Sequence, residues 1–229
     1  MKQKLLILFI FIGLNVSYAA GNNVEINCKL VGINNINQCV LSIKNGNAPA
    51  VYAITNMPYA LCSKALCTLT NDGKFANCKC ELENYPNGWK SLSLSPTSYT
   101  SAKPTMDEKG NLQSVQSNYS MANITNFSQS ANHQCKYTKP HPWANCYGVR
   151  CTVKTININE KNRQVANCVC PVNQATSYLI GTTGSSACHL SENKVWSATT
   201  GASLKVYGTN PMNILYKKLY PNSSPVKNM

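Results

Sequence analysis

A block of four cysteines occurs twice in the chain with the same neighbours, and this repetition constrains the fold more than any other feature. The first copy runs from Met57 to Cys80 and the second from His141 to Cys170. Each contains a Pro followed by an aromatic residue, an Ala, two Cys separated by four residues, a Thr, and the motif Ala-Asn-Cys-X-Cys. Such self-similarity indicates an internal duplication. We therefore expect a mainly β protein built from two homologous small modules that disulfides stabilise.

The first residues of the chain have the composition of a secretory signal peptide. Two lysines precede an apolar run from Leu5 to Leu14, and the small residue Ala19 ends the polar stretch that follows. An apolar run of this length is too short to span a bilayer as a helix, and the pattern is typical of a cleaved export signal. We expect cleavage after Ala19, a secreted or periplasmic location, and no transmembrane segment after signal cleavage.

The cysteine count and spacing predict the disulfide pairs. All twelve cysteines follow Ala19, and an even number in an oxidising compartment indicates six disulfides. Cys78 and Cys80 are two apart on an expected strand, so they point to the same face and are poorly placed to bond each other. A hairpin that turns at Asp72 and Gly73 brings Cys67 opposite Cys78. The favoured pairs are Cys28–Cys39, Cys62–Cys80, Cys67–Cys78, Cys135–Cys188, Cys146–Cys170 and Cys151–Cys168.

Two features leave alternatives to this pairing. Each block also allows a second local connectivity, and Cys28 or Cys39 could bond elsewhere in the chain. In favour of the chosen register, the second block has six more residues between its second and third cysteines than the first. An even insertion at a hairpin tip preserves which side chains face each other, so Cys151 still lies opposite Cys168.

Composition predicts how the chain divides. Two β-branched runs between Val24 and Ile43 predict an N-terminal hairpin, whereas the stretch from Pro96 to Gln134 is too rich in Asn and Ser for a stable helix. That stretch is either a free connection or an irregular strand on a module. The expected division is a signal peptide 1–19, a first β module 20–97 with the hairpin and the first four-Cys block, a polar Ser/Thr/Asn-rich connection 98–134, a second β module 135–210 and a basic C-terminal tail 211–229.

The charge of the chain indicates the kind of partner. The formal charge of +13 comes almost entirely from lysine, with Arg150 and Arg163 the only arginines. A strongly basic surface attracts anionic polymers, lipid headgroups and acidic protein surfaces, but direct base recognition relies on arginine, so sequence-specific nucleic-acid binding is not expected. Aromatic residues next to lysines form the candidate binding surface. This surface comprises Trp89, Lys90, Tyr216, Lys217, Lys218 and Tyr220.

Enzymatic and metal-binding alternatives have weaker support in the sequence. Cys188 and His189 are neighbours, but neighbours on a strand point to opposite faces. Glu81 and Glu83 could share a face, yet glycosidase carboxylates normally approach across a cleft from separate elements. The four-Cys blocks could hold zinc. We assign no catalytic residue, metal ligand or cofactor, and expect a binding protein for an anionic envelope, glycan or protein surface. The alternatives are a secreted hydrolase of an extracellular polymer and a structural or zinc-holding module.

Overall fold

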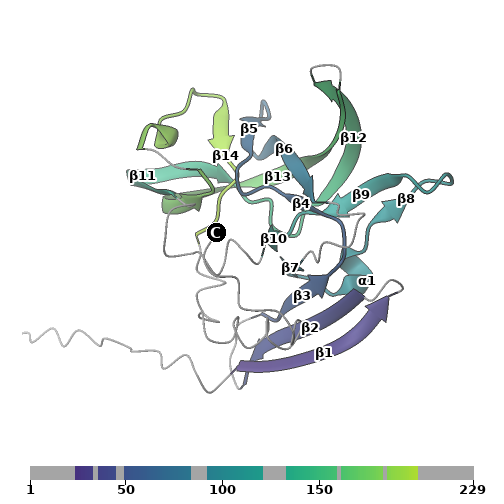
Figure 1. Ribbon diagram of the computed structural model, residues 1–229. Helices are drawn as coiled ribbons and strands as arrows, with labels where there is room; N and C mark the ends of the chain where they lie inside the picture. Colours follow the sequence, from purple (N-terminus) through teal and green to yellow (C-terminus); the bar gives the residue numbers. More distant parts are fainter. Residues whose placement is uncertain are drawn as a thin grey trace, which may run out of the picture.

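The computed structural model describes residues 24–32, 36–44, 49–83, 92–120, 133–158, 161–182 and 185–200 (Figure 1). The expected signal peptide 1–19 and the expected tail 211–229 lie outside these residues. The described chain is mainly β, as predicted. Its strands are β1 (Val24–Gly32), β2 (Ile36–Ile43), β3 (Val51–Thr55), β4 (Tyr59–Leu61), β5 (Leu66–Leu69), β6 (Phe75–Glu83), β7 (Leu92–Ser95), β8 (Thr105–Met106), β9 (Leu112–Gln116), β10 (Tyr119–Ser120), β11 (His133–Ala144), β12 (Arg150–Ile158), β13 (Lys161–Ile180) and β14 (Lys194–Trp196). The helices are the single turn α1 (Tyr99–Ala102) and the 3₁₀ turn η1 (Ser185–Cys188).

The strands form two sheets. The smaller has the order β1-β2-β3-β7-β10 and begins with the predicted N-terminal hairpin, in which Cys28 lies opposite Cys39. The larger has the order β14-β5-β6-β13-β12-β9-β8, with β4 also paired to β6 and β11 to β13. Figure 1 shows the small sheet below the large one. Since β10 follows β9 almost directly, the chain passes from the large sheet into the small one at this point.

The two four-Cys blocks meet at the centre of the large sheet. β6 pairs antiparallel with β13, and Cys78 lies directly opposite Cys168. On one side of this pair Asn77 faces Val169, and on the other side Asn167 faces Lys79. The two asparagines hold the same position in their blocks, each directly before the C-X-C cysteines. The pairing is therefore the same when read from either strand, so this part of the sheet has a local twofold pseudo-symmetry.

The same correspondence extends to the strands around this centre. Cys67 faces Cys78 in the first block and Cys151 faces Cys168 in the second, as the predicted hairpin registers require. The edges are exchanged between the blocks. β9 follows the first block but pairs with β12 of the second, and β14 follows the second block but pairs with β5 of the first. The segment 98–134 therefore contributes strands β8, β9 and β10 in addition to the turn α1.

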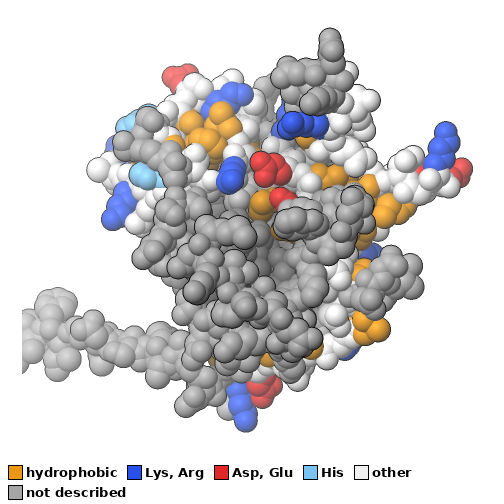
Figure 2. Space-filling model, in the orientation of Figure 1, with side chains coloured by type: hydrophobic (Ala, Val, Ile, Leu, Met, Phe, Trp, Pro, Cys, Tyr) orange, Lys and Arg blue, Asp and Glu red, His pale blue; other side chains and the backbone are white. Residues whose placement is uncertain are grey.

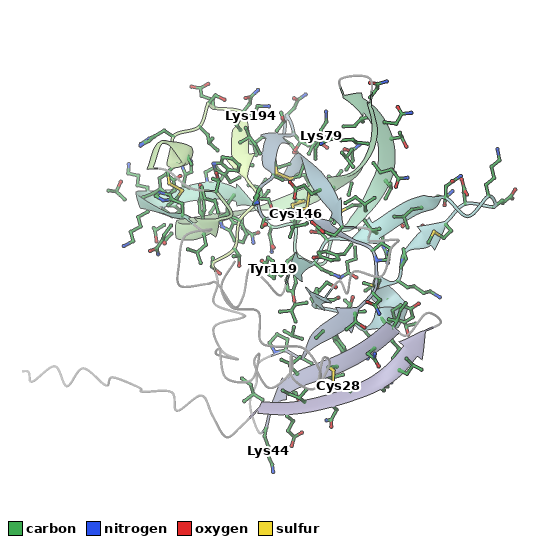
Figure 3. All side chains as sticks on the ribbon, in the orientation of Figure 1. Cys28, Lys44, Lys79, Tyr119, Cys146 and Lys194 are labelled. Atoms are coloured by element: carbon green, nitrogen blue, oxygen red, sulfur yellow. A yellow bond between two sulfur atoms is a disulfide. The ribbon has the colours of Figure 1, made fainter. Side chains whose placement is uncertain are left out.

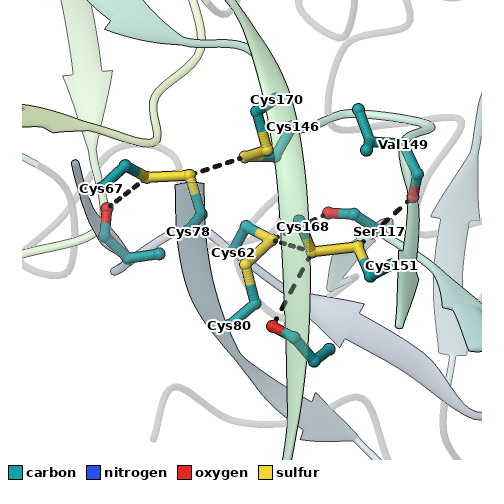
Figure 4. Close-up of a disulfide and its surroundings, with 12 residues drawn as sticks. Cys62, Cys67, Cys78, Cys80, Ser117, Cys146, Val149, Cys151, Cys168 and Cys170 are labelled. Atoms are coloured by element: carbon teal, nitrogen blue, oxygen red, sulfur yellow. Dashed lines mark hydrogen bonds between the residues drawn. A yellow bond between two sulfur atoms is a disulfide. The ribbon is translucent and has the colours of Figure 1, made fainter. Parts of the chain in front are cut away.

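The core between these strands is made largely of sulfur. The disulfides Cys62–Cys80, Cys67–Cys78, Cys146–Cys170 and Cys151–Cys168 all belong to one buried cluster. They touch across the blocks: the Cys62 and Cys168 sulfurs are 3.6 Å apart and the Cys78 and Cys146 sulfurs 3.5 Å apart (Figure 4). The same cluster contains the fully buried alanines Ala60, Ala76, Ala144 and Ala166 together with the larger Leu112, Val115 and Val195. The four cystines are therefore packed among both small and branched side chains.

Gly148 is a position where the fold requires glycine. It has φ +81°, and a Cβ there would lie 2.6 Å from Cγ of Pro96. We expect Gly148→Ala to destabilise the protein by about 2–5 kcal/mol, because a positive φ costs about 1–2 kcal/mol and an overpacked contact about 1–3 kcal/mol. Gly110→Ala is the matched control, since Gly110 has φ +78° with nothing within 4 Å of its Cβ position. Urea unfolding of both variants checks this. An equal loss of unfolding free energy in the two variants would show that Pro96 moves away from the new Cβ at no cost in stability.

Candidate functional site

The sequence-predicted site residues divide into two groups. All twelve cysteines are disulfide-bonded, and the six pairs coincide with those favoured from the sequence. The candidate binding surface lies outside the described residues. This applies to Trp89, Lys90, Tyr216, Lys217, Lys218 and Tyr220.

A second basic surface, distinct from the candidate surface expected from the sequence, lies over the twofold centre of the large sheet. The cysteines of β5, β6, β12 and β13 point into the core, so the residues between them point outward. These outward side chains border a pocket of about 570 Å³. We call this surface the lysine face; it comprises Lys79, Lys154, Lys194, Asn77, Asn167, Thr68, Thr152, Leu66 and Val169.

The cross-strand register places much of the lysine face in two rows, while Lys154 lies in a third row, opposite Val165, which lies opposite Glu81. In one of the two rows Lys194 lies opposite Thr68, which lies opposite Asn77. In the other, Thr152 lies opposite Asn167, which lies opposite Lys79. Each of these two rows therefore contains a Thr and an Asn on neighbouring strands, with a lysine at one end. Figure 2 shows separate blue groups at the end of the molecule where β5, β6, β12 and β14 lie, with red groups near them and further blue groups elsewhere on this face.

The three lysines differ in how firmly they are held. Lys194 is partly buried and its Nζ donates to Oγ1 of Thr68 at 2.7 Å, which leaves two ammonium donors for a ligand. Lys79 and Lys154 are exposed on β6 and β12. Figure 3 shows Lys79 and Lys194 on neighbouring parts of the large sheet, far from Lys44 at the opposite end of the molecule. The lysine face thus combines one ammonium group held in place by a hydrogen bond, that of Lys194, with two exposed lysine side chains that can change rotamer to meet a ligand.

The polar groups of the lysine face suit a ligand that also carries hydroxyl or amide hydrogens. Oδ1 of Asn167 is buried and has no hydrogen-bond donor among the described residues. No carboxylate belongs to the described lining of this pocket, and the exposed Glu81 lies outside it, two residues beyond Lys79 on β6. The described lining is therefore positive, and Glu81 lies at its border in the same cross-strand row as Lys154.

The described residues offer neither a free cysteine nor a histidine in a described pocket for the enzymatic and zinc alternatives. Cys188 is bonded to Cys135, so it is not a free nucleophile, and because all twelve cysteines are in disulfides no thiolate remains for a metal. His133, His141 and His189 contribute to neither pocket whose lining is described. The imidazole ring of His141 instead stacks on the ring of Tyr137, with centroids 4.1 Å apart.

A signal for the lysine face is present in the sequence. Once the C-X-C cysteines are assigned to the core, alternation requires Asn77, Lys79 and Asn167 to point outward together. What the sequence does not contain is the pairing of β6 with β13 that places the two blocks side by side.

No helix of the described chain is long and apolar enough to cross a membrane. Comparison of the chain with protein-family models, curated proteins and solved structures gave no match.

Proposed function

We propose that the protein is an exported binding protein that holds an anionic glycan on its lysine face. The observation that carries this proposal is the clustering of Lys79, Lys154 and Lys194 around the outward asparagines, with no carboxylate in the described lining. Ammonium groups provide attraction for sulfate or carboxylate groups, and the Asn and Thr side chains provide neutral hydrogen bonds to sugar hydroxyls.

The spacing of the lysines favours an extended polymer over a single small anion. Lys194 lies on β14 and Lys154 on β12, with β5, β6 and β13 between them. Four strand spacings of about 4.8 Å separate the two, or roughly 19 Å. A ligand that contacts all three lysines must span this width, as a chain of several sugar units can. No arginine belongs to the described lining of the lysine face, which is the reason to prefer a glycan over nucleic acid.

We also propose that the chain arose by internal duplication, consists of two modules, and is exported. The matching registers in the two blocks support an origin by internal duplication, with modules 20–97 and 135–210 joined through 98–134. Six disulfides are compatible with an oxidising compartment, which supports a signal peptide at 1–19 and a secreted or periplasmic location.

The test is binding of a sulfated heparin-type oligosaccharide to the chain lacking residues 1–19. We expect K79Q/K154Q/K194Q to weaken binding about tenfold or more, because exposed charge pairs contribute roughly 0.5–1 kcal/mol each. Binding by the wild type should also weaken as salt rises, because salt screens exposed charges. Isothermal titration calorimetry at two salt concentrations measures both effects.

The matched control removes the same charge from elsewhere. Lys29, Lys44 and Lys136 are exposed and lie outside the lysine face, so K29Q/K44Q/K136Q should change the affinity less than about threefold. Equal losses in the two triple variants would mean that overall charge, and not this surface, attracts the polymer. No binding by the wild type at low salt would refute the proposal.

A further inference from the structure

A second pocket, of about 610 Å³, lies away from the lysine face. Its walls come from β10, the end of β11, the turn that follows β11, β13 from Val172 to Gln174, and the residues Thr199 and Thr200 that follow β14. We call it the aromatic pocket; the side chains that decide its chemistry are Tyr119, Trp143, Tyr147, Asn145, Asn173 and Gln174. Figure 3 shows Tyr119 near the junction with the small sheet, apart from Lys79 and Lys194. The volume lies within the range of about 300–1,000 Å³ that is usual for small-molecule sites.

Aromatic rings form one wall of this pocket. The rings of Tyr119 and Tyr147 are stacked with centroids 4.3 Å apart and an angle of 15° between their planes. Trp143 is 5% exposed and packs against Tyr178 in the core behind the pocket, with centroids 6.3 Å apart. The face of an aromatic ring is weakly negative, and the C–H groups on one face of a pyranose ring are apolar and weakly positive. Such a wall therefore suits a sugar ring.

Neutral polar groups form the rest of the pocket. The amides of Asn145, Asn173 and Gln174 each offer donors and an acceptor, which is the combination that a sugar hydroxyl needs. Oδ1 of Asn145 accepts the backbone N–H of Tyr147 at 3.4 Å, so the amide is oriented with its Nδ2 donors turned to other partners. The indole N–H of Trp143 is a buried donor with no acceptor among the described residues.

The aromatic pocket carries no charge in its described lining. It contains neither a lysine nor a carboxylate, in contrast to the lysine face. Burial raises the pKa of Tyr119 to about 12, only partly offset by a hydrogen bond with Thr199. A phenol is neutral at physiological pH even at its ordinary pKa, and burial extends this to more alkaline conditions, so the hydroxyl can both donate and accept. A neutral ligand rich in hydroxyl groups fits this lining better than an anion does.

The first block shows that the fold does not require these residues. Where the second block has Trp143, Asn145 and Tyr147, the first has Tyr59, Leu61 and Ser63. Nevertheless Ala60 pairs with Leu82 in the same register as Ala144 pairs with Val172. The same pairing is made with a different set of side chains, so the aromatic and amide set is a property of the second block alone.

We propose that the aromatic pocket binds a neutral pyranose unit, independently of the anionic glycan proposed for the lysine face. The sugar ring packs against the stacked pair of Tyr119 and Tyr147 on the ring surface that the stacking leaves uncovered, and its hydroxyl groups exchange hydrogen bonds with Asn145, Asn173 and Gln174. The protein then recognises a glycan by two different kinds of contact, one that depends on charge and one that does not.

The test uses neutral trisaccharides of glucose, galactose, mannose and N-acetylglucosamine as probes of the chain lacking residues 1–19. Saturation-transfer NMR detects binding and titration gives the affinity, both in about 1 M sodium chloride, where the screening length is only about 3 Å. We expect at least one probe to bind under these conditions. Tyr147→Ala should weaken it about tenfold or more, whereas Tyr147→Phe, which keeps the ring, should retain affinity within about threefold.

A second variant protects the test against misfolding. Asn173 is exposed, so Asn173→Ala removes a pocket amide without disturbing the core and should weaken binding about threefold to tenfold. Thermal unfolding identifies any variant that fails to fold, and the exposed-site variant then decides the outcome. Absence of binding by all four probes would overturn the proposal. So would an affinity that is unchanged in both Tyr147→Ala and Asn173→Ala.

Discussion

Replacing Cys67 and Cys78 together by alanine is expected to destabilise the protein by about 4–5 kcal/mol. Closing a loop with a sequence separation of 11 contributes about 3 kcal/mol through the entropy of the unfolded chain. The remainder comes from packing, because both residues are almost completely buried and the Cys78 sulfur touches that of Cys146 at 3.5 Å. Urea unfolding of the oxidised variant measures the loss.

The N-terminal hairpin offers a matched control for this experiment. Cys28 and Cys39 have the same sequence separation of 11, but Cys28 is partly exposed and the pair lies outside the sulfur cluster. The chain-entropy contribution is therefore equal, and alanine at both positions should cost only about 3 kcal/mol. A loss for the hairpin pair as large as that for Cys67 and Cys78 would show that the sulfur contacts add nothing to stability.

Tyr178→Ala is expected to cost about 3–5 kcal/mol, the range for truncating a large buried aromatic side chain. Tyr178 is 1% exposed and lies between the rings of Tyr137 and Trp143, at centroid distances of 5.6 and 6.3 Å. The loss arises from the cavity, since alanine fills little of the space. Thermal and urea unfolding give the size of the effect.

Tyr178→Phe separates the hydroxyl from the ring. The hydroxyl groups of Tyr178 and Tyr137 are 3.0 Å apart, and the Tyr137 hydroxyl also donates to the backbone oxygen of Cys188 at 2.9 Å. Tyr137 therefore keeps a partner in the Phe variant, and we expect a loss of only about 1 kcal/mol. A similar loss in the Ala and Phe variants would mean that the hydrogen bond, and not the ring, accounts for the stability.

The features that could be predicted from the sequence depend on nearby residues. The hairpin registers that bring Cys28 to Cys39 and Cys67 to Cys78 follow from turn residues and alternation, because the strands are close in sequence. The length of β13 is harder to predict from nearby residues, because this strand runs without interruption from Lys161 to Ile180 and includes Pro171. Pro171 lies at the end of the pairing with β6, so its missing N–H does not break that ladder.

The features that could not be predicted depend on pairing between distant segments. Nothing near Cys78 in the sequence indicates that it lies opposite Cys168, or that Val115 and Val195 complete the edges of the opposite blocks. The lysine face depends on these pairings, since Lys194 approaches Thr68 only through β14. The aromatic pocket likewise joins Tyr119 to Tyr147 through packing, not through sequence proximity.

The exchange of edge strands also sets the order in which the chain can complete its structure during synthesis. The nested bonds Cys62–Cys80 and Cys67–Cys78 close short loops and can form once the first block is in an oxidising environment, without any residue of the second block. The edge of β5, however, stays unpaired until Lys194–Trp196 has been synthesised. An unpaired edge is prone to pair with other chains. The two nested bonds therefore hold β4, β5 and β6 in register through the interval in which the nascent chain has no strand to cover that edge.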